Sequence, residues 1–170
     1  MIDVPEGLEI VDQHIAHERF LYEQLQQNKD RNSQILLISE IIDIEPVDVE
    51  LLNSNKELLK KYGYDFEIKY GNKFTFKKIP QMLSQVPMKE LLSNLLEDFQ
   101  SNVEEIEDKI LTTTACKAAV KANTKLNIFQ MQELIANWRT TKNPHTCPHG
   151  RPISVVIPHK KIAGYFLRQQ

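Results

Sequence analysis

Three residues with metal-binding side chains stand close together near the start of the chain, namely Asp12, His14 and Glu18. His14 and Glu18 are four residues apart, which places them on one face of a helix that would begin at Asp12. Clustered carboxylate and imidazole groups can hold cations that neutralise a phosphate and supply hydroxide near neutral pH. A helix-capping aspartate followed by an exposed histidine–glutamate pair fits the same spacing, so both interpretations stay open. His17 lies off this face and is expected at the surface.

A cysteine and a histidine form a second group toward the other end of the chain. Cys147 and His149 flank one proline, and a thiolate and an imidazole so close together can bind one borderline ion, with zinc the best match. Two ligands do not complete a site, so others would come from the first group or from Cys116. The alternative is a buried structural cysteine in a loop bounded by prolines.

Basic residues gather in the last third of the chain, whereas residues 40–57 are acidic. Lys117 and Lys121 are one helical turn apart, and Arg151 follows the cysteine–histidine pair. The net charge of −2 gives no overall attraction to nucleic acid, so DNA phosphates would have to be bound by such local basic groups. Ordinary solvated charge is the alternative for most individual lysines.

Hydrophobic periodicity predicts the elements that must position these residues. The expected helices cover residues 13–27, 46–63, 88–99, 115–122 and 127–140. The expected strands cover residues 8–11, 34–44, 64–70, 73–78 and 153–157, with a hairpin turn at Gly71-Asn72. Residues 162–166 fit either a weak strand or a short helix.

Composition is that of an ordinary globular protein, with 41% hydrophobic and 26% charged residues in 170. No window holds the roughly 18–20 uncharged apolar residues of a membrane span, and the N-terminus lacks the pattern of a signal peptide. Without a secretory signal, the two cysteines favour a metal or thiol role over a disulfide. The sequence therefore indicates a cytoplasmic protein.

Three separated stretches together resemble the signature motifs of the MutL C-terminal domain, in the endonuclease-proficient branch of these DNA mismatch-repair proteins. They are DQHIAHERFLYE, ACKAAVKA and CPHGRP, which begin at residues 12, 115 and 147. The first motif of that branch has the form D-Q-H-A-x-x-E-x-x-x-x-E, and Asp12, Gln13, His14, Glu18 and Glu23 are in register with it. Ile15 replaces the usual alanine, at a position that is not a ligand.

The resemblance implies a metal-dependent DNA nicking endonuclease, a hydrolase that acts in mismatch repair. It implies a two-ion site in which zinc is regulatory or structural and manganese supports nicking, with Asp12 and Glu18 holding the catalytic ion. The metal ligands implied are Asp12, His14, Glu18, Cys116, Cys147 and His149. Lys117, Lys121 and Arg151 are the expected DNA contacts.

The fold implied is α+β and two-lobed. Residues 1–45 and 112–170 would form a mixed α/β dimerisation lobe that carries the metal site, and residues 46–111 an inserted, largely helical regulatory lobe. The implied partners are a second copy of the chain, double-stranded DNA and the replication sliding clamp. A mismatch-recognition protein would bind through an N-terminal part that this sequence lacks, and the implied location is the cytoplasm, at the bacterial nucleoid.

Three departures from the family pattern shape the expectations. The chain starts at a turn, Pro5–Gly7, that a further strand usually precedes, so we expect one edge of the sheet to be absent. The clamp motif resembles Gln-x-x-Leu/Ile-x-Pro, and its nearest match here begins at Gln34, includes Leu36 and Leu37, and has Ser39 in place of proline. A buried strand explains that run equally well.

No glycine motif for nucleotide binding is present, so the ATPase part of full-length relatives is missing and nicking by this chain alone should be weak. An alternative function follows from this absence. The chain would then be a zinc-stabilised homodimerisation and partner-docking module without useful nuclease activity in isolation. A plain structural domain without metal is a third, weaker hypothesis.

Overall fold

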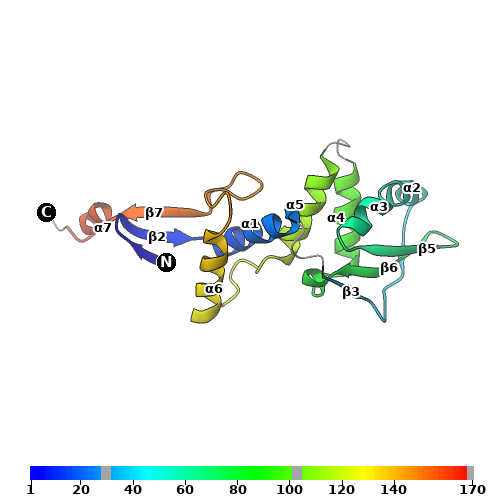
Figure 1. Ribbon diagram of the computed structural model, residues 1–170, viewed down its shortest axis with the longest axis horizontal. Coiled ribbons are helices and arrows are strands. Elements are labelled where there is room, and N and C mark those ends of the chain that lie inside the picture. Colours follow the sequence, from blue (N-terminus) through cyan, green and yellow to red (C-terminus); the bar gives the residue numbers. More distant parts are fainter. Residues whose placement is uncertain (28–31, 101–104, 168–170) are drawn as a thin grey trace. The chain divides into compact units, whose positions relative to one another are not determined.

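The computed structural model describes residues 1–27, 32–100 and 105–167, and it has the mixed α+β fold expected from the sequence (Figure 1). The chain divides into two compact units. Unit 1 combines Met1–Glu23 with Ala119–Gln170, and unit 2 consists of Gln24–Ala118. Unit 2 contains the predicted 46–111 insertion and extends beyond it at both ends. Within the described ranges, no helix combines the length and apolar character that a membrane crossing requires.

Unit 1 is built on a three-stranded antiparallel sheet in the order β1-β2-β7. Its strands are β1 (Ile2–Val4), β2 (Gly7–Val11) and β7 (Ser154–Pro158). The backbone at Gly7 has a φ of +154°, and a Cβ there would lie 2.1 Å from the carbonyl oxygen of Ile157 on β7. Only glycine allows the two strands to pair this closely at the start of β2.

The helices of unit 1 are α1 (Gln13–Gln26, whose last residues belong to unit 2), α6 (Ile128–Arg139) and α7 (His159–Tyr165). Ala16, Trp138 and Ile153 form a small buried core, and Val11, Ile15, Leu134 and Ile135 pack against it. Trp138 donates its indole N–H to the carbonyl of Pro144, which ties α6 to the loop that follows it. This core fixes α1 against the start of β7.

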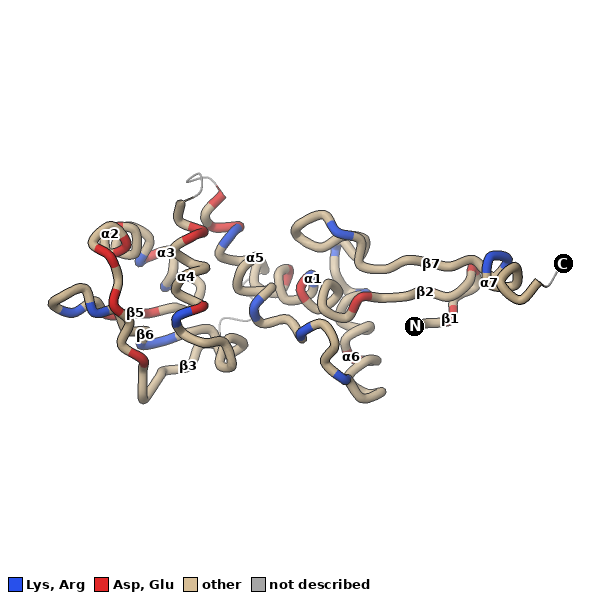
Figure 2. The backbone as a smooth tube through the Cα atoms, turned by 180° about the vertical axis from the view of Figure 1, so that it is seen from behind, with Lys and Arg blue, Asp and Glu red and all other residues tan. Residues whose placement is uncertain are grey.

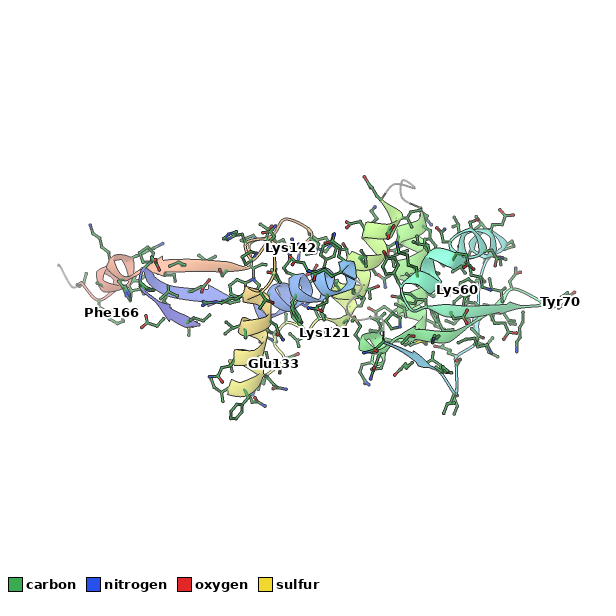
Figure 3. All side chains as sticks on the ribbon, in the orientation of Figure 1. Lys60, Tyr70, Lys121, Glu133, Lys142 and Phe166 are labelled. Carbon is green, nitrogen blue, oxygen red and sulfur yellow. The ribbon has the colours of Figure 1, made fainter. Side chains whose placement is uncertain are left out.

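Unit 2 is a second antiparallel sheet covered by helices (Figure 1). Strand β6 (Lys73–Pro80) pairs with β3 (Ser33–Ile35), β4 (Ile42–Asp43) and β5 (Asp65–Lys69). The helices are α2 (Pro46–Ser54), α3 (Lys56–Lys61), the 3₁₀ turn η1 (Gln81–Leu83), α4 (Met88–Phe99) and α5 (Ile106–Ala118). The predicted hairpin at Gly71-Asn72 and the predicted helix 88–99 are confirmed, and Tyr70 lies at the hairpin tip (Figure 3). Unit 2 therefore combines helices with a four-stranded sheet, as an α+β fold requires.

The prediction of one continuous strand over residues 34–44 is wrong. Only Ser33–Ile35 and Ile42–Asp43 pair with β6, and the residues between them form no strand. Leu37 and Ile38 are 96% and 94% exposed, so this apolar run is not buried. An isoleucine-rich run has strand propensity, but a strand also needs a partner along its whole length, which β6 does not provide here.

Three smaller expectations also need correction. The single helix expected over residues 46–63 is interrupted at Asn55, which lies between α2 and α3. The sheet edge expected to be absent is present, because β1 precedes the Pro5–Gly7 turn and pairs with β2. The helix expected over residues 115–122 ends at Ala118 as part of α5. Of the two forms expected near the C-terminus, the structure has the helix, α7.

Candidate metal centre

Helix α1 brings His14 and Glu18 onto one face, one turn apart. Asp12 caps this helix, because its Oδ1 accepts the backbone N–H groups of His14 (2.9 Å) and Ile15 (3.0 Å). The helix-cap interpretation of Asp12 is thus confirmed. A cap uses one carboxylate oxygen, so the other oxygen still has lone pairs for a ligand.

The loop between α6 and β7 is a tight, internally bonded turn that positions Cys147 and His149. The N–H of Cys147 donates to the carbonyl of Arg151 and the N–H of Gly150 donates to the carbonyl of Cys147, each at 2.9 Å. The N–H of Arg151 also donates to the Cys147 sulfur at 3.4 Å. Cys147 is buried and His149 is exposed, so the sulfur lies inside the unit and the imidazole at its surface.

Glu18 stands between the two histidines of the predicted ligand set. Its Oε1 lies 2.9 Å from His149 Nδ1, and its Oε2 lies 3.9 Å from His14 Nε2. His149 Nδ1 in turn lies 3.9 Å from the Cys147 sulfur. The ligand atoms of Glu18, Cys147 and His149 all lie within 4.8 Å of one another. Tertiary folding of unit 1 therefore joins the two groups that the sequence separates.

The buried carboxylate of Glu18 has an unsatisfied oxygen. The Oε1 atom is shielded from solvent and makes no hydrogen bond with any described group, although His149 Nδ1 is close. A buried carboxylate oxygen without a hydrogen bond or a cation is costly. A carboxylate oxygen, a cysteine sulfur and a histidine ring nitrogen, which lie close together here, are ligand types that zinc binds. The donor set therefore fits the ion implied by the resemblance.

Cys116 belongs to α5 in unit 2, so its part in the site stays a prediction. Lys117 is also in unit 2, where its Nζ lies 2.7 Å from Glu90 Oε1. Lys121 and Arg151 are exposed in unit 1. Figure 2 shows basic positions on the connector before α6 and on the loop before β7. A role of Lys117, Lys121 and Arg151 in DNA binding stays a prediction.

Sequence reasoning missed a buried ion pair that supports the loop. Arg19 and Glu23 are 8% and 6% exposed, and their side chains approach to 3.7 Å. Glu23 accepts the backbone N–H groups of Lys142 (2.7 Å) and Asn143 (3.2 Å), while Arg19 Nε donates to the carbonyl of Thr146 at 2.7 Å. The pair thus attaches α1 to the residues just before Cys147. The i,i+4 spacing of an arginine and a glutamate was the available signal.

The expectation that His17 lies at the surface is wrong. His17 is half-buried, and burial together with the nearby His14 lowers its pKa below the usual histidine value. Its ring nitrogen Nδ1 accepts the backbone N–H of Val120 at 3.0 Å. Helical spacing alone could not show this contact, because the partner lies on the connector between α5 and α6.

Fold and site together define an α+β protein with a partly buried cluster of oxygen, sulfur and nitrogen ligand atoms suited to a borderline metal ion. The family described as "MutL C terminal dimerisation domain" matches residues 1–126. The chain is similar to the "DNA mismatch repair protein MutL" of Caldanaerobacter subterraneus subsp. tengcongensis, with 36% identity over 165 residues, and to that of Methanocorpusculum labreanum, with 35% over 164. The chain therefore belongs to the MutL C-terminal domain family of mismatch-repair proteins.

These alignments cover 94% of this chain but only 28% of each relative. The corresponding protein of Fervidobacterium nodosum is 36% identical over 169 residues, with 96% and 28% covered. The chain thus spans little more than a quarter of the length of these relatives. The family match ends at residue 126, so Cys147 and His149 lie outside it. Both residues follow the first two motifs along the chain.

Proposed function

We propose that this chain is a metal-dependent DNA endonuclease domain that nicks double-stranded DNA in mismatch repair. The observation that carries the proposal is the unsatisfied, buried Oε1 of Glu18 beside His149 and Cys147. Burying a carboxylate in this way is unfavourable unless a cation completes the arrangement. Membership of the MutL family supports DNA as the substrate.

The candidate site residues have different roles in this proposal. Cys147, His149 and Glu18 would hold zinc, with Cys116 as a further ligand. Asp12, His14 and Glu18 would hold the manganese ion. A bound divalent ion supplies charge neutralisation at the phosphate and hydroxide near neutral pH. Lys121, Arg151 and Lys117 bind phosphates of the DNA backbone as point charges or, for arginine, as a fork.

The exposed Asp12 gives the direct test of this function. Asparagine caps a helix as well as aspartate does, so Asp12→Asn keeps the start of α1 and removes only the negative charge. We expect manganese-dependent nicking of supercoiled plasmid by the wild-type chain, and a loss of about 10²-fold or more in Asp12→Asn, since even an outer-shell partner of a metal contributes about 10–100-fold. Relaxed-circle formation on agarose gels, with and without manganese, measures both.

The result that contradicts this function is a wild-type chain that binds zinc and dimerises but never nicks, even at high protein concentration with manganese. That result favours the alternative, a zinc-stabilised homodimerisation and partner-docking module. Equal nicking by wild type and Asp12→Asn would remove Asp12 from the catalytic site. Zinc content is measured on the same samples by elemental analysis.

A homodimer is part of the proposal. Unit 1 exposes apolar side chains that an isolated monomer would leave in water, on α6 and on β7. They are Ile128, Phe129, Met131, Val155 and Val156, all more than 40% exposed. Contiguous exposed apolar surface is typical of protein–protein interfaces, and the family is described as a dimerisation domain.

The exposed run between β3 and β4 supports a second partner, the sliding clamp. Gln34, Leu36 and Leu37 belong to the predicted motif, and the failure of this run to form a strand leaves Leu37 and Ile38 in solvent. The hydroxyl of Ser39, at the position of the missing proline, donates to the carbonyl of Phe76 at 2.6 Å. This bond restrains the backbone at the point where proline would have done so.

We therefore expect Leu37→Ser combined with Ile38→Ser to weaken binding to a bacterial sliding clamp at least about tenfold, because two apolar anchors of about 1.5 kcal/mol or more each are removed. Thermal stability should stay near that of wild type, since both side chains are exposed. Val47→Ser, which removes an exposed valine of α2, is the matched control. Surface plasmon resonance with immobilised clamp measures the change, and undiminished binding of the double variant would exclude this surface.

A further inference from the structure

The peptide group of Val120 lies between two histidines of α1. Its carbonyl oxygen is 2.9 Å from His14 Nδ1, and its N–H donates to His17 Nδ1 at 3.0 Å. His14 and His17 are three residues apart, so they stand on neighbouring turns of the helix and face the same segment. All of these atoms belong to unit 1.

The two contacts decide where the protons are. A carbonyl oxygen can only accept, so His14 must carry its proton on Nδ1, and a backbone N–H can only donate, so Nδ1 of His17 must be unprotonated. Neutral His14 then has its lone pair on Nε2, the nitrogen that lies 3.9 Å from Glu18 Oε2. A metal-binding histidine needs this tautomer, and it needs its unprotonated nitrogen on the side of the other ligands, as Nε2 of His14 is here.

The connector that contains Val120 is held by a third side chain of the same helix. The amide of Gln13 donates to the carbonyls of Lys121 (3.1 Å) and Thr124 (2.9 Å). Gln13 therefore fixes the chain that follows Val120, while His17 holds Val120 itself. No bond of His17 reaches the ligand atoms of the candidate centre, so its effect on them passes through the Val120 peptide.

We propose that His17 is a positioning residue of the metal centre: by accepting the Val120 N–H it fixes the carbonyl that keeps His14 in its metal-binding tautomer. This inference rests on the proposed function, because His14 is a metal ligand only there. The alternative is that His17 merely fills space between α1 and α6. His17, Phe20 and Glu133 line a pocket of about 330 Å³, so the site has room for other side chains of a similar size at position 17.

Three substitutions separate the hydrogen bond from the volume of the ring. His17→Asn places an oxygen where Nδ1 was and keeps the acceptor. His17→Leu removes it, and His17→Gln moves the oxygen to the place of Nε2 while leaving a polar side chain that folds readily. His159→Leu, at an exposed histidine on α7, is the control.

The first measurement is made on metal-free protein, by long-range ¹H–¹⁵N NMR of the imidazole rings. We expect His14 to be protonated on Nδ1 in wild type, His17→Asn and His159→Leu, and to become a mixture dominated by the Nε2 form in His17→Leu and His17→Gln. The second measurement is manganese affinity by chelator competition, because His14 belongs to the proposed manganese ligands. It should fall about 10–100-fold in His17→Leu and His17→Gln and return near the wild-type value in His17→Asn.

An unchanged His14 tautomer and manganese affinity in His17→Leu and His17→Gln would overturn the inference. An equal fall in manganese affinity for all three His17 variants, with the tautomer unchanged, would assign His17 to packing and overturn it as well. A wild-type protein that binds no manganese, but whose His14 tautomer still responds to His17→Leu, would instead overturn the proposed metal centre, and with it the positioning role. The failures of the two proposals are thus distinguishable.

Discussion

Glu18→Gln should lose zinc and nicking together while the metal-free protein becomes more stable. Glutamine has the same shape as glutamate, so the packing of α1 is kept, but the negative charge that faces His149 and His14 is gone. A neutral amide is a poor ligand for zinc, so we expect zinc affinity and plasmid nicking to fall by about 10²-fold or more. In the absence of metal, a neutral amide costs less to bury than a carboxylate with an unsatisfied oxygen, so the free energy of unfolding should rise by on the order of 1 kcal/mol.

The two expected effects have opposite signs, because zinc binding and nicking weaken while the metal-free protein becomes more stable. A purely structural role for Glu18 would lower stability in the variant and leave zinc content as it is. Chelator competition, plasmid nicking and urea denaturation with and without EDTA measure the three quantities. Glu6→Gln, at an exposed glutamate in the turn before β2, is the control and should change none of them. A fall in the stability of metal-free Glu18→Gln would contradict the assignment of Oε1 as a metal-ligand atom that lacks a hydrogen-bond partner.

Glu23→Leu should destabilise the fold by about 3–5 kcal/mol, because it leaves the buried guanidinium of Arg19 without its counter-charge. The N–H groups of Lys142 and Asn143 also lose their acceptor, so the loop that carries Cys147 is released. Zinc affinity should therefore fall in the same variant, although Glu23 is no ligand. Chemical denaturation of the metal-free chain measures the first effect, and chelator competition measures the second.

A double variant separates the charge from the hydrogen bonds. In Arg19→Met combined with Glu23→Leu no charge is left buried, so part of the lost stability should return while the loop remains loose. Arg139→Met removes one side of the ion pair with Glu9, in which the arginine side chain is 52% exposed, and it should cost no more than about 1 kcal/mol. A double variant no more stable than Glu23→Leu would mean that the backbone contacts, rather than the ion pair, carry the effect.

Local patterns in the sequence were enough for elements whose stability is mostly local. Helix α4 begins and ends where its apolar spacing predicts, and the hairpin of β5 and β6 forms about Gly71-Asn72. The start of α1 at Asp12 follows from a cap that acts over three residues. The prediction of a strand over residues 34–44 failed because strand formation depends on a partner far along the chain, which a local pattern does not contain.

The sequence by itself determined the family and the chemical types of the site residues, since three motifs carry Asp12, His14, Glu18, Cys147 and His149 in a recognisable order. Only the tertiary structure decided that Glu18 meets His149 and that its Oε1 atom lacks a hydrogen bond. It likewise decided that Glu23 accepts a backbone N–H of the loop before Cys147. It also decided that His14 and His17 both hydrogen-bond to the peptide group of Val120. Residue types follow from the order of the chain, but the surroundings of a buried atom are set by segments distant in sequence, which only folding brings together.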